Sequence, residues 1–296
     1  MVFAPGAKIR NYLLLFATAV LFSTGGAAIK ASAFTSWQVA GFRSGIAALT
    51  LYILLPGARR GWSWRTGLIG LAYAATLILF VLANRLTTAA NAIFLQSTAP
   101  VYLLLLGPLV LREAVRKIDI AVIAGILAGA FLLLSGSESA ASAPNPRLGN
   151  LVALASGLAW GLTIAGLRWM AKREHQPGSA AATVIVGNLT AFAVCLPMAF
   201  PLGSVPLSSV AGLLYLGIFQ VALAYICLTR ALRCVRGFEA ATILLLEPVL
   251  NPFWAWAIQG ERPSTLAVCG GMAIIFTVFA ASWMQNSSVR SVVTRV

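Results

Sequence analysis

The chain has 296 residues, of which 60% are hydrophobic and 9% are charged, a balance far outside that of soluble domains. Its formal net charge of +14 would suit a nucleic-acid partner, but the basic residues occur in twos and threes between long apolar stretches. No basic helix face or aromatic-interleaved groove sequence is found. The composition therefore argues against nucleic acid and predicts an all-α membrane protein whose main partner is membrane lipid.

Residues suited to catalysis or metal binding are scarce. The cysteines, Cys195, Cys227, Cys234 and Cys269, lie in or beside apolar segments, and none has the two-residue spacing of a zinc or redox pair. His175 is the single histidine and lies in a charged stretch, so no Ser-His or Cys-His dyad is available. We expect no metal, no cofactor and no enzymatic activity.

The apolar residues are grouped into runs of the length that crosses a bilayer, which takes about 20 residues as a helix. Ten runs are predicted, at residues 11–29, 37–56, 67–84, 90–111, 118–135, 148–170, 178–200, 208–228, 239–258 and 264–284. The connector at 135–148 is rich in Gly, Ser, Ala and Pro and divides the runs into two sets of five. We expect a first unit at residues 1–140 and a second unit at 141–296.

The distribution of Lys and Arg predicts the orientation, because cytoplasmic loops carry the excess. With the N-terminus inside, sixteen of the 21 basic residues fall on the cytoplasmic side and Arg43 lies within a span. The remaining four, Lys30, Arg85, Arg147 and Arg262, fall outside. Ten helices with both termini in the cytoplasm is the consistent solution.

A different reading of the N-terminus starts from Lys8 and Arg10, which precede an apolar run, and from residues 31–33, which resemble a signal-peptidase site. Cleavage there would leave nine helices. The run is longer than a typical signal core and Lys30 stands just before the site, so a retained first helix is favoured.

The two halves of the sequence contain a repeated block. Residues 92–113 align without gaps on residues 240–261, with Pro100 opposite Pro248 and Glu113 opposite Glu261. Phe22 stands where the second half has Trp160. An odd number of helices in each copy inverts the second copy in the membrane. Inverted repeats of this kind are typical of transporters.

These features resemble the drug/metabolite transporter superfamily, specifically its ten-helix EamA-type exporters. The residues that carry the resemblance are Phe42-Arg43, Trp160-Gly161 and the paired blocks that end at Glu113 and Glu261. Within that group the chain looks most like the bacterial aromatic amino-acid exporters. The resemblance implies export across the bacterial inner membrane, and export as the direction comes from it alone.

Ionisable groups inside a span are costly in hydrocarbon and mark functional candidates. Glu247 is the single acidic residue placed well inside a span. It is a candidate proton site or a candidate partner for a substrate ammonium group, and the alternative role is a hydrogen bond that fixes helix packing. Arg43 could contact a carboxylate, but an ion pair or snorkelling to the headgroups is favoured. Pro100 and Pro248 are predicted to kink their helices and are candidate hinges.

Uncharged polar and aromatic side chains offer the rest of a binding site. A planar substrate would stack on aromatic walls, and its zwitterionic head would need the few hydrogen-bonding groups. The candidates, besides Glu247, are Tyr73, Phe80, Asn84, Gln96, Tyr102, Trp160 and Tyr225. Packing between helices is the alternative role for each of them.

The sequence thus predicts a secondary transporter of small organic solutes, with amino acids that have aromatic or apolar side chains favoured. A multidrug or other metabolite exporter is the alternative within transport, and a membrane-embedded enzyme or scaffold is the alternative outside it. Glycine pairs four residues apart, such as Gly41 with Gly45 and Gly157 with Gly161, allow close helix approach. They leave a homodimer and a monomer both open, with packing inside one chain favoured.

Overall fold

The structure is a computed structural model, and it describes residues 5–111, 117–135, 143–172, 179–260, 265–266, 268–273 and 276–277. Within these ranges every regular element is a helix. The first-half helices are α1 (Pro5–Ser23), α2 (Gly25–Ala31), α3 (Ser36–Leu54), η1 (Pro56–Arg60), α4 (Trp64–Leu86), α5 (Ala89–Gln96), α6 (Ala99–Leu106), η2 (Gly107–Leu111) and α7 (Lys117–Ser135). The second-half helices are α8 (Pro146–Lys172), α9 (Ser179–Cys195), η3 (Leu196–Met198), α10 (Leu207–Tyr215), η4 (Leu216–Leu223), α11 (Ala224–Ala231), α12 (Gly237–Leu244) and α13 (Leu246–Gln259).

Seven candidate membrane spans, judged by length and hydropathy, are present among the described residues. They are Ile9–Ala31, Trp64–Leu86, Ala89–Leu111, Pro146–Lys172, Ser179–Met198, Leu207–Ala231 and Gly237–Ile258, each within a few residues of a predicted run. The chain is therefore an all-helical, multi-span membrane protein.

Three predicted runs are not among these seven. The run at 37–56 forms the helix α3, whose hydropathy is lowered by Gln38, Arg43 and Ser44. The run at 118–135 forms α7. Most of the run at 264–284 lies outside the described residues.

Two of the seven spans are broken near their middle. The first break lies at Ser97 and Thr98, between α5 and α6, and Pro100 follows in the first turn of α6. The second break lies at Leu245, between α12 and α13, and Pro248 follows in α13. Proline cannot donate the backbone hydrogen bond that would continue each helix, so the predicted kinks occur where the repeat places them.

The wider turns η2 and η4 are π-helical. The turn η4 connects α10 to α11 without a loop, so residues Leu207–Ala231 form one span with an expanded middle. Such π-helical insertions are frequent at functional sites.

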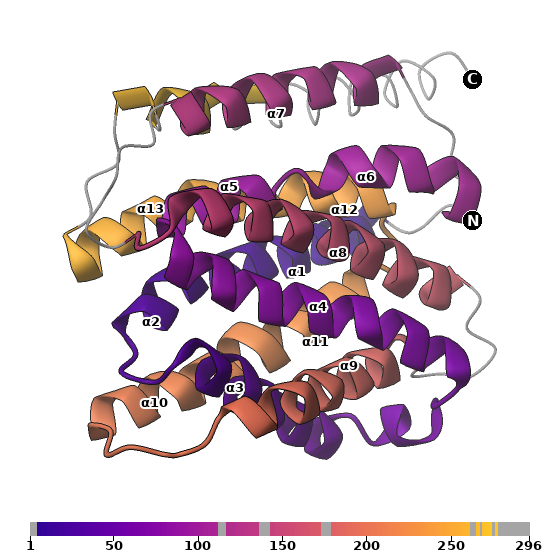
Figure 1. Cartoon of the computed structure of the whole chain (residues 1–296). Coiled ribbons are helices and arrows are strands. Elements are labelled where there is room, and N and C mark those ends of the chain that lie inside the picture. Colours follow the sequence, from indigo (N-terminus) through magenta and orange to yellow (C-terminus); the bar gives the residue numbers. More distant parts are fainter. Residues whose placement is uncertain are drawn as a thin grey trace, which may run out of the picture.

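The helices pack side by side with α4 and α8 near the centre (Figure 1). The helix α4 contacts α8 and α9, α3 contacts α9 and η4, and α1 contacts α11 and α13. The helix α7 lies along one side, where it contacts α5 and α6 (Figure 1).

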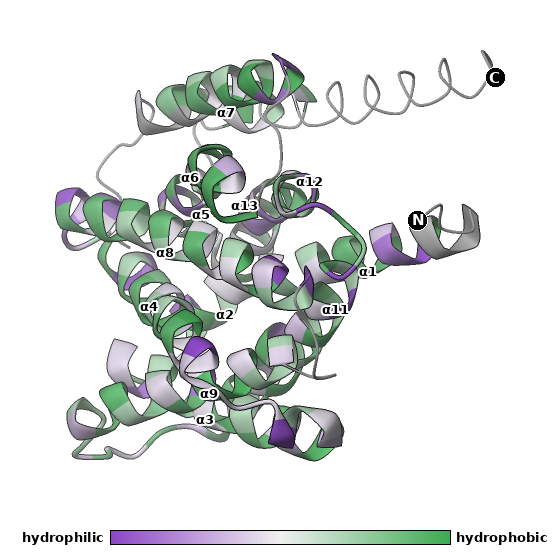
Figure 2. Ribbon diagram, turned by 90° about the vertical axis from the view of Figure 1, so that its right-hand side faces the viewer, coloured by the Kyte–Doolittle hydropathy of each residue, from purple (hydrophilic) through white to green (hydrophobic). Residues whose placement is uncertain are grey.

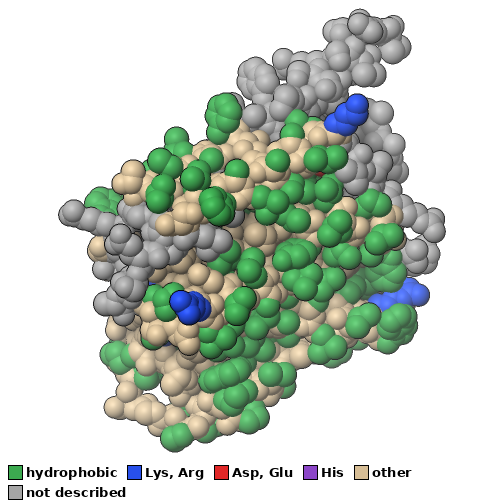
Figure 3. Space-filling view, turned by 45° about the horizontal axis from the view of Figure 1, so that its top comes forward, with side chains coloured by type: hydrophobic (Ala, Val, Ile, Leu, Met, Phe, Trp, Pro, Cys, Tyr) green, Lys and Arg blue, Asp and Glu red, His purple; other side chains and the backbone are tan. Residues whose placement is uncertain are grey.

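The outer surface is apolar, as expected where lipid is the solvent. Figure 2 shows hydrophobic residues along most of the helices. In Figure 3 they spread over the face in view, and the visible Lys and Arg side chains are few and far apart. Leu109 and Leu207, for example, have more than four fifths of their surface exposed.

The close-packing glycines predicted from the sequence make contacts within the chain. A Cβ atom on Gly41 would lie 2.9 Å from Cβ of Cys195, and one on Gly45 would lie 3.0 Å from the ring of Phe192. These glycines let α3 and α9 approach closely. Gly157 likewise brings α8 against the break between α5 and α6, because its Cβ would lie 2.9 Å from the carbonyl oxygen of Leu95.

Candidate functional site

A small cavity of about 30 Å³ lies at the level of the two helix breaks. Its apolar and aromatic lining consists of Phe22, Leu77, Phe80, Trp160, Val221 and Tyr225. Its polar lining consists of Arg43, Thr76, Gln96, Gln220 and Glu247. These residues come from both halves of the chain, so the two halves meet at the cavity.

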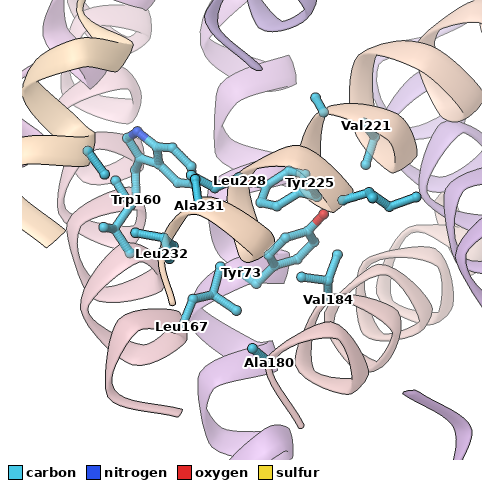
Figure 4. Packing of buried hydrophobic residues seen from close by; sticks show 14 of the residues in the cluster. Tyr73, Trp160, Leu167, Ala180, Val184, Val221, Tyr225, Leu228, Ala231 and Leu232 are labelled. Carbon is cyan, nitrogen blue, oxygen red and sulfur yellow. The ribbon is translucent and has the colours of Figure 1, made fainter. Parts of the chain in front are cut away.

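One wall of the cavity is an aromatic cluster. The ring centroid of Phe22 lies 5.9 Å from that of Trp160 and 5.2 Å from that of Tyr225. Trp160 and Tyr225 are 6.0 Å apart with nearly perpendicular rings. Edge-to-face contacts of this kind stabilise a fixed arrangement of rings. Tyr73 packs behind this wall, with its ring centroid 4.6 Å from that of Tyr225 (Figure 4).

Hydrogen bonds hold the neutral polar side of the cavity in place. The amide Nε2 of Gln96, the last residue of α5, donates to Oγ of Ser156 on α8 at 2.7 Å. The hydroxyl of Ser156 donates to the backbone oxygen of Thr76 at 3.3 Å, and the hydroxyls of Thr76 and Thr163 are 3.1 Å apart. These hydrogen bonds connect the C-terminal end of α5 to α4 and α8.

Two ionisable side chains line the same cavity. Glu247 is the second residue of α13, directly after the second break, and is 7% exposed. Arg43 lies midway along α3 and is 1% exposed. Its guanidinium donates to the backbone oxygen of Leu77 at 3.0 Å and to Oε1 of Gln220 at 3.4 Å. Arg43 therefore points into the protein interior, and the expectation that it snorkels to the headgroups is wrong.

Five of the eight predicted substrate-binding residues line the cavity. They are Phe80, Gln96, Trp160, Tyr225 and Glu247. Tyr73 lies behind Tyr225, and its hydroxyl accepts a hydrogen bond from Nδ2 of Asn188 at 2.8 Å. Tyr102 lies on α6 and packs against Gly161 rather than on the cavity.

Asn84 does not line the cavity but belongs to a second group of buried polar side chains. Its Nδ2 donates to the backbone oxygen of Phe80 at 3.0 Å, and its Oδ1 finds no partner among the described residues. A Cβ on Gly26 would lie 3.2 Å from that Oδ1 and 2.8 Å from Nδ2 of Asn251. The side chains of Asn84 and Asn251 therefore both lie against Gly26 of α2.

Six cavity residues are not among the site residues predicted from the sequence: Phe22, Arg43, Thr76, Leu77, Gln220 and Val221. Phe22, Thr76 and Gln220 lie in spans whose apolar residues cover every side, so the sequence gives their depth but not their facing direction. The internal repeat does place Phe22 opposite Trp160, and this alignment could have identified it. For Arg43 the sequence favours an ion pair or snorkelling over a carboxylate contact.

The described residues contain no group of three or more His, Cys, Asp or Glu side chains that could hold a metal ion. What the cavity offers is aromatic surface, hydrogen-bonding amides and one group of each charge. These groups are suited to binding a small organic molecule rather than to bond-breaking chemistry.

Multiple spans, two discontinuous helices and a polar cavity between them define a secondary transporter. The chain belongs to the EamA-like transporter family, whose model matches it twice, at residues 9–135 and 147–283. This is a transporter family and not an enzyme family. The protein is accordingly a secondary transporter of the EamA family.

Relatives extend along most of the chain. An uncharacterized protein of Pseudomonas aeruginosa PAO1 is 32% identical over 292 residues, which cover 90% of this chain and 94% of the relative. The pseudopaline exporter CntI of P. aeruginosa UCBPP-PA14 is 25% identical over 285 residues, covering 91% and 95%. An uncharacterized transporter of Archaeoglobus fulgidus is 29% identical over 226 residues, covering 73% and 75%.

A solved crystal structure has the same fold. It aligns with a TM-score of 0.72 at 18% sequence identity and covers 94% of this chain and 98% of the other.

Proposed function

We propose that this transporter exports small organic solutes, chiefly amino acids with aromatic or apolar side chains, across the bacterial inner membrane. The observation that carries the proposal is the aromatic wall of the cavity. Phe22, Trp160 and Tyr225 present ring surfaces beside the amides of Gln96 and Gln220. A planar apolar side chain can pack on the rings while the polar lining of the cavity binds the polar end of the solute.

The solute crosses by alternating access. A cavity of about 30 Å³ has room for about two water molecules, far below the roughly 300 Å³ or more of a ligand pocket. The helices must therefore separate before a solute enters. The breaks beside Gln96 and Glu247 border the cavity, and Pro100 and Pro248 are the proposed hinges.

The proposed architecture is ten transmembrane helices in two inverted five-helix repeats, at residues 1–140 and 141–296, with both termini in the cytoplasm. The two separate matches of the family model support the duplication. The excess of Lys and Arg in one set of loops supports the orientation. The helices α3 and α7 support two of the three further spans.

A second candidate substrate class is a larger metabolite or a drug. It is favoured by the similarity to CntI, which is a pseudopaline exporter. Glu247 in the cavity would also suit a cationic drug. The two classes differ in whether an aromatic amino acid competes for the site.

Uptake into liposomes that contain the purified protein tests this proposal. Labelled tryptophan, phenylalanine, alanine and a cationic dye are compared. We expect saturable flux of tryptophan and phenylalanine, each inhibiting the other. Flux of the dye alone would favour the multidrug candidate. No flux under any gradient would contradict transport of these classes.

The aromatic wall is tested by Trp160→Ala. The variant removes ring surface from the cavity, so flux of tryptophan should fall about tenfold or more while flux of alanine changes little. Trp62→Ala is the control, because Trp62 is 49% exposed on the outer surface. Equal losses for both amino acids would indicate structural damage in place of a binding role.

A further inference from the structure

The cavity holds one basic and one acidic side chain, on helices from opposite halves of the chain. Arg43 comes from α3 and Glu247 from the start of α13. Among the described residues, the guanidinium of Arg43 bonds only to uncharged oxygens, those of Leu77 and Gln220. Its Nε atom is buried without a hydrogen-bond partner.

Glu247 is in a matching situation. Its carboxyl group borders the cavity, and no ion pair or hydrogen bond joins it to another side chain in the described part of the chain. A charge deep in a membrane protein is expensive unless a partner of opposite charge reaches it. Two such groups on one cavity are therefore best satisfied by a molecule that carries both opposite charges.

The surroundings fix the position of the guanidinium. Gln220 lies in the wide turn η4 and accepts from Arg43, while its amide end is packed against α2, because a Cβ on Gly25 would lie 2.7 Å from Nε2 of Gln220. A planar guanidinium held in this way can bind a carboxylate through two parallel hydrogen bonds. Gln220 is thus a positioning residue for Arg43.

We propose that the cavity is built for zwitterions: Arg43 binds the carboxylate of the solute and Glu247 binds its ammonium group, with the side chain directed to the aromatic wall. This inference rests on the proposed transport function and narrows its substrate class. A molecule with either charge missing leaves one buried group uncompensated. The transporter therefore discriminates against simple amines and simple carboxylic acids of the same shape.

The test compares four labelled probes in proteoliposomes: phenylalanine, phenethylamine without the carboxylate, 3-phenylpropionate without the ammonium, and alanine. The wild type is expected to carry phenylalanine at least about tenfold faster than either one-charge analogue, since losing one charge-assisted hydrogen bond costs about that factor. Alanine keeps both charges and reports on the zwitterion site without the aromatic side chain.

Two variants separate the charges. In Arg43→Gln, phenylalanine flux should fall about 10- to 100-fold and its advantage over phenethylamine should vanish, while its advantage over 3-phenylpropionate remains. In Glu247→Gln the pattern should reverse. Arg43→Lys keeps the charge but not the planar fork and should retain part of the activity.

The control is Arg59→Gln. Arg59 is exposed and bonds to the backbone oxygen of Tyr52 at 2.8 Å, away from the cavity, so the probe preferences should stay those of the wild type. Thermal unfolding of each variant shows whether it remains folded.

The outcomes distinguish this inference from the proposed function. If Arg43→Gln and Glu247→Gln lower the flux of every probe by the same factor, the two residues are structural and the zwitterion site is rejected, while transport stands. Wild-type flux of phenethylamine equal to that of phenylalanine would reject it too. Flux of alanine without phenylalanine would contradict the aromatic preference alone. No flux of any probe would overturn both proposals.

Discussion

The break between α5 and α6 and the break between α12 and α13 occupy corresponding places in the repeat but are stabilised differently. At the first break, the hydroxyls of Ser97 and Thr98 donate to the backbone oxygens of Ile93 and Leu95 at 2.6 and 2.7 Å. Gln96 is tied to α8 through its bond to Ser156. The polar groups at this break are largely satisfied by neighbouring side chains.

The second break lacks such side chains. The side chain of Leu245, at the break, can offer no hydrogen bond, and Glu247 lines the cavity just beyond it. One turn further, both polar atoms of the fully buried Asn251 amide lack partners among the described residues. Unsatisfied buried groups cost free energy, so they persist where function needs them. Of the two proposed hinges, we therefore expect the first to be held more firmly by packing and the second to respond more strongly to the solute.

The largest effect is expected from Gly157→Val, which disrupts the first break. A Cβ at this position would lie 2.9 Å from the backbone oxygen of Leu95 and 2.8 Å from Oγ1 of Thr98, so α8 must move away. We expect destabilisation on the order of 1–3 kcal/mol and a lower unfolding temperature in detergent. The control Gly212→Ala has no atom within 4 Å of the added Cβ and should unfold like the wild type. Matching unfolding temperatures for both variants would contradict the packing role.

The next effect concerns the ionisable group at the second break. If Glu247 takes up the proton that drives export, an acidic exterior should accelerate efflux by the wild type, and Glu247→Gln should make efflux independent of the pH gradient. Efflux of labelled phenylalanine from proteoliposomes with and without a gradient measures this. The aligned residue of the first half is Ala99, which cannot titrate. A gradient response unchanged in Glu247→Gln would remove the proton-carrying role.

The two prolines should respond unequally. Pro248→Ala restores a backbone N–H that can bond to the oxygen of Leu244, which straightens the helix and shifts Glu247, so flux should fall about tenfold. Pro100→Ala should change flux by less than about threefold, because the hydroxyls of Ser97 and Thr98 already hold the first break. Initial rates of phenylalanine flux for both variants provide the measurement. Equal losses would mean that the two breaks act as matched hinges.

The smallest effect is expected from Asn251→Leu, a near-isosteric change at the second break. Because the amide is buried without partners in the described structure, leucine should raise stability by about 1 kcal/mol. We also expect slower transport, since the polar group that is costly in the closed packing would be hydrated when α2 moves away. Unfolding temperature and flux are measured together. A less stable variant would show that the amide has partners that stabilise it.

The sequence predicts the helices well because the membrane sets a single dominant rule for their length. The predicted run at 90–111 corresponds to the span Ala89–Leu111, and the run at 239–258 corresponds to Gly237–Ile258. The repeat and the prolines also indicate where these two spans break. Each of these features is local along the chain.

The site was predicted less completely because it depends on the direction in which each side chain points. Spans that are apolar on all sides give little sign of which face is inward. Tyr102 and Tyr225 were equal candidates by composition, but only Tyr225 lines the cavity. Arg43 shows the same limit. Its position along the span, about two turns from one end, is compatible with snorkelling, but the face of α3 on which it lies directs its side chain to Gln220.

The wide turn η4 has a consequence for sequence change over time. A π-helical turn holds more residues than an α-helical turn. Deleting one residue there can therefore restore α-helical geometry while α10 and α11 keep their positions in the structure. The residues within the turn would then face different directions, Gln220 and Val221 among them. A one-residue deletion at this place could therefore leave the fold intact while it exchanges the side chains presented to the solute. Substrate preference could thus diverge among relatives through length changes inside a span as well as through substitutions.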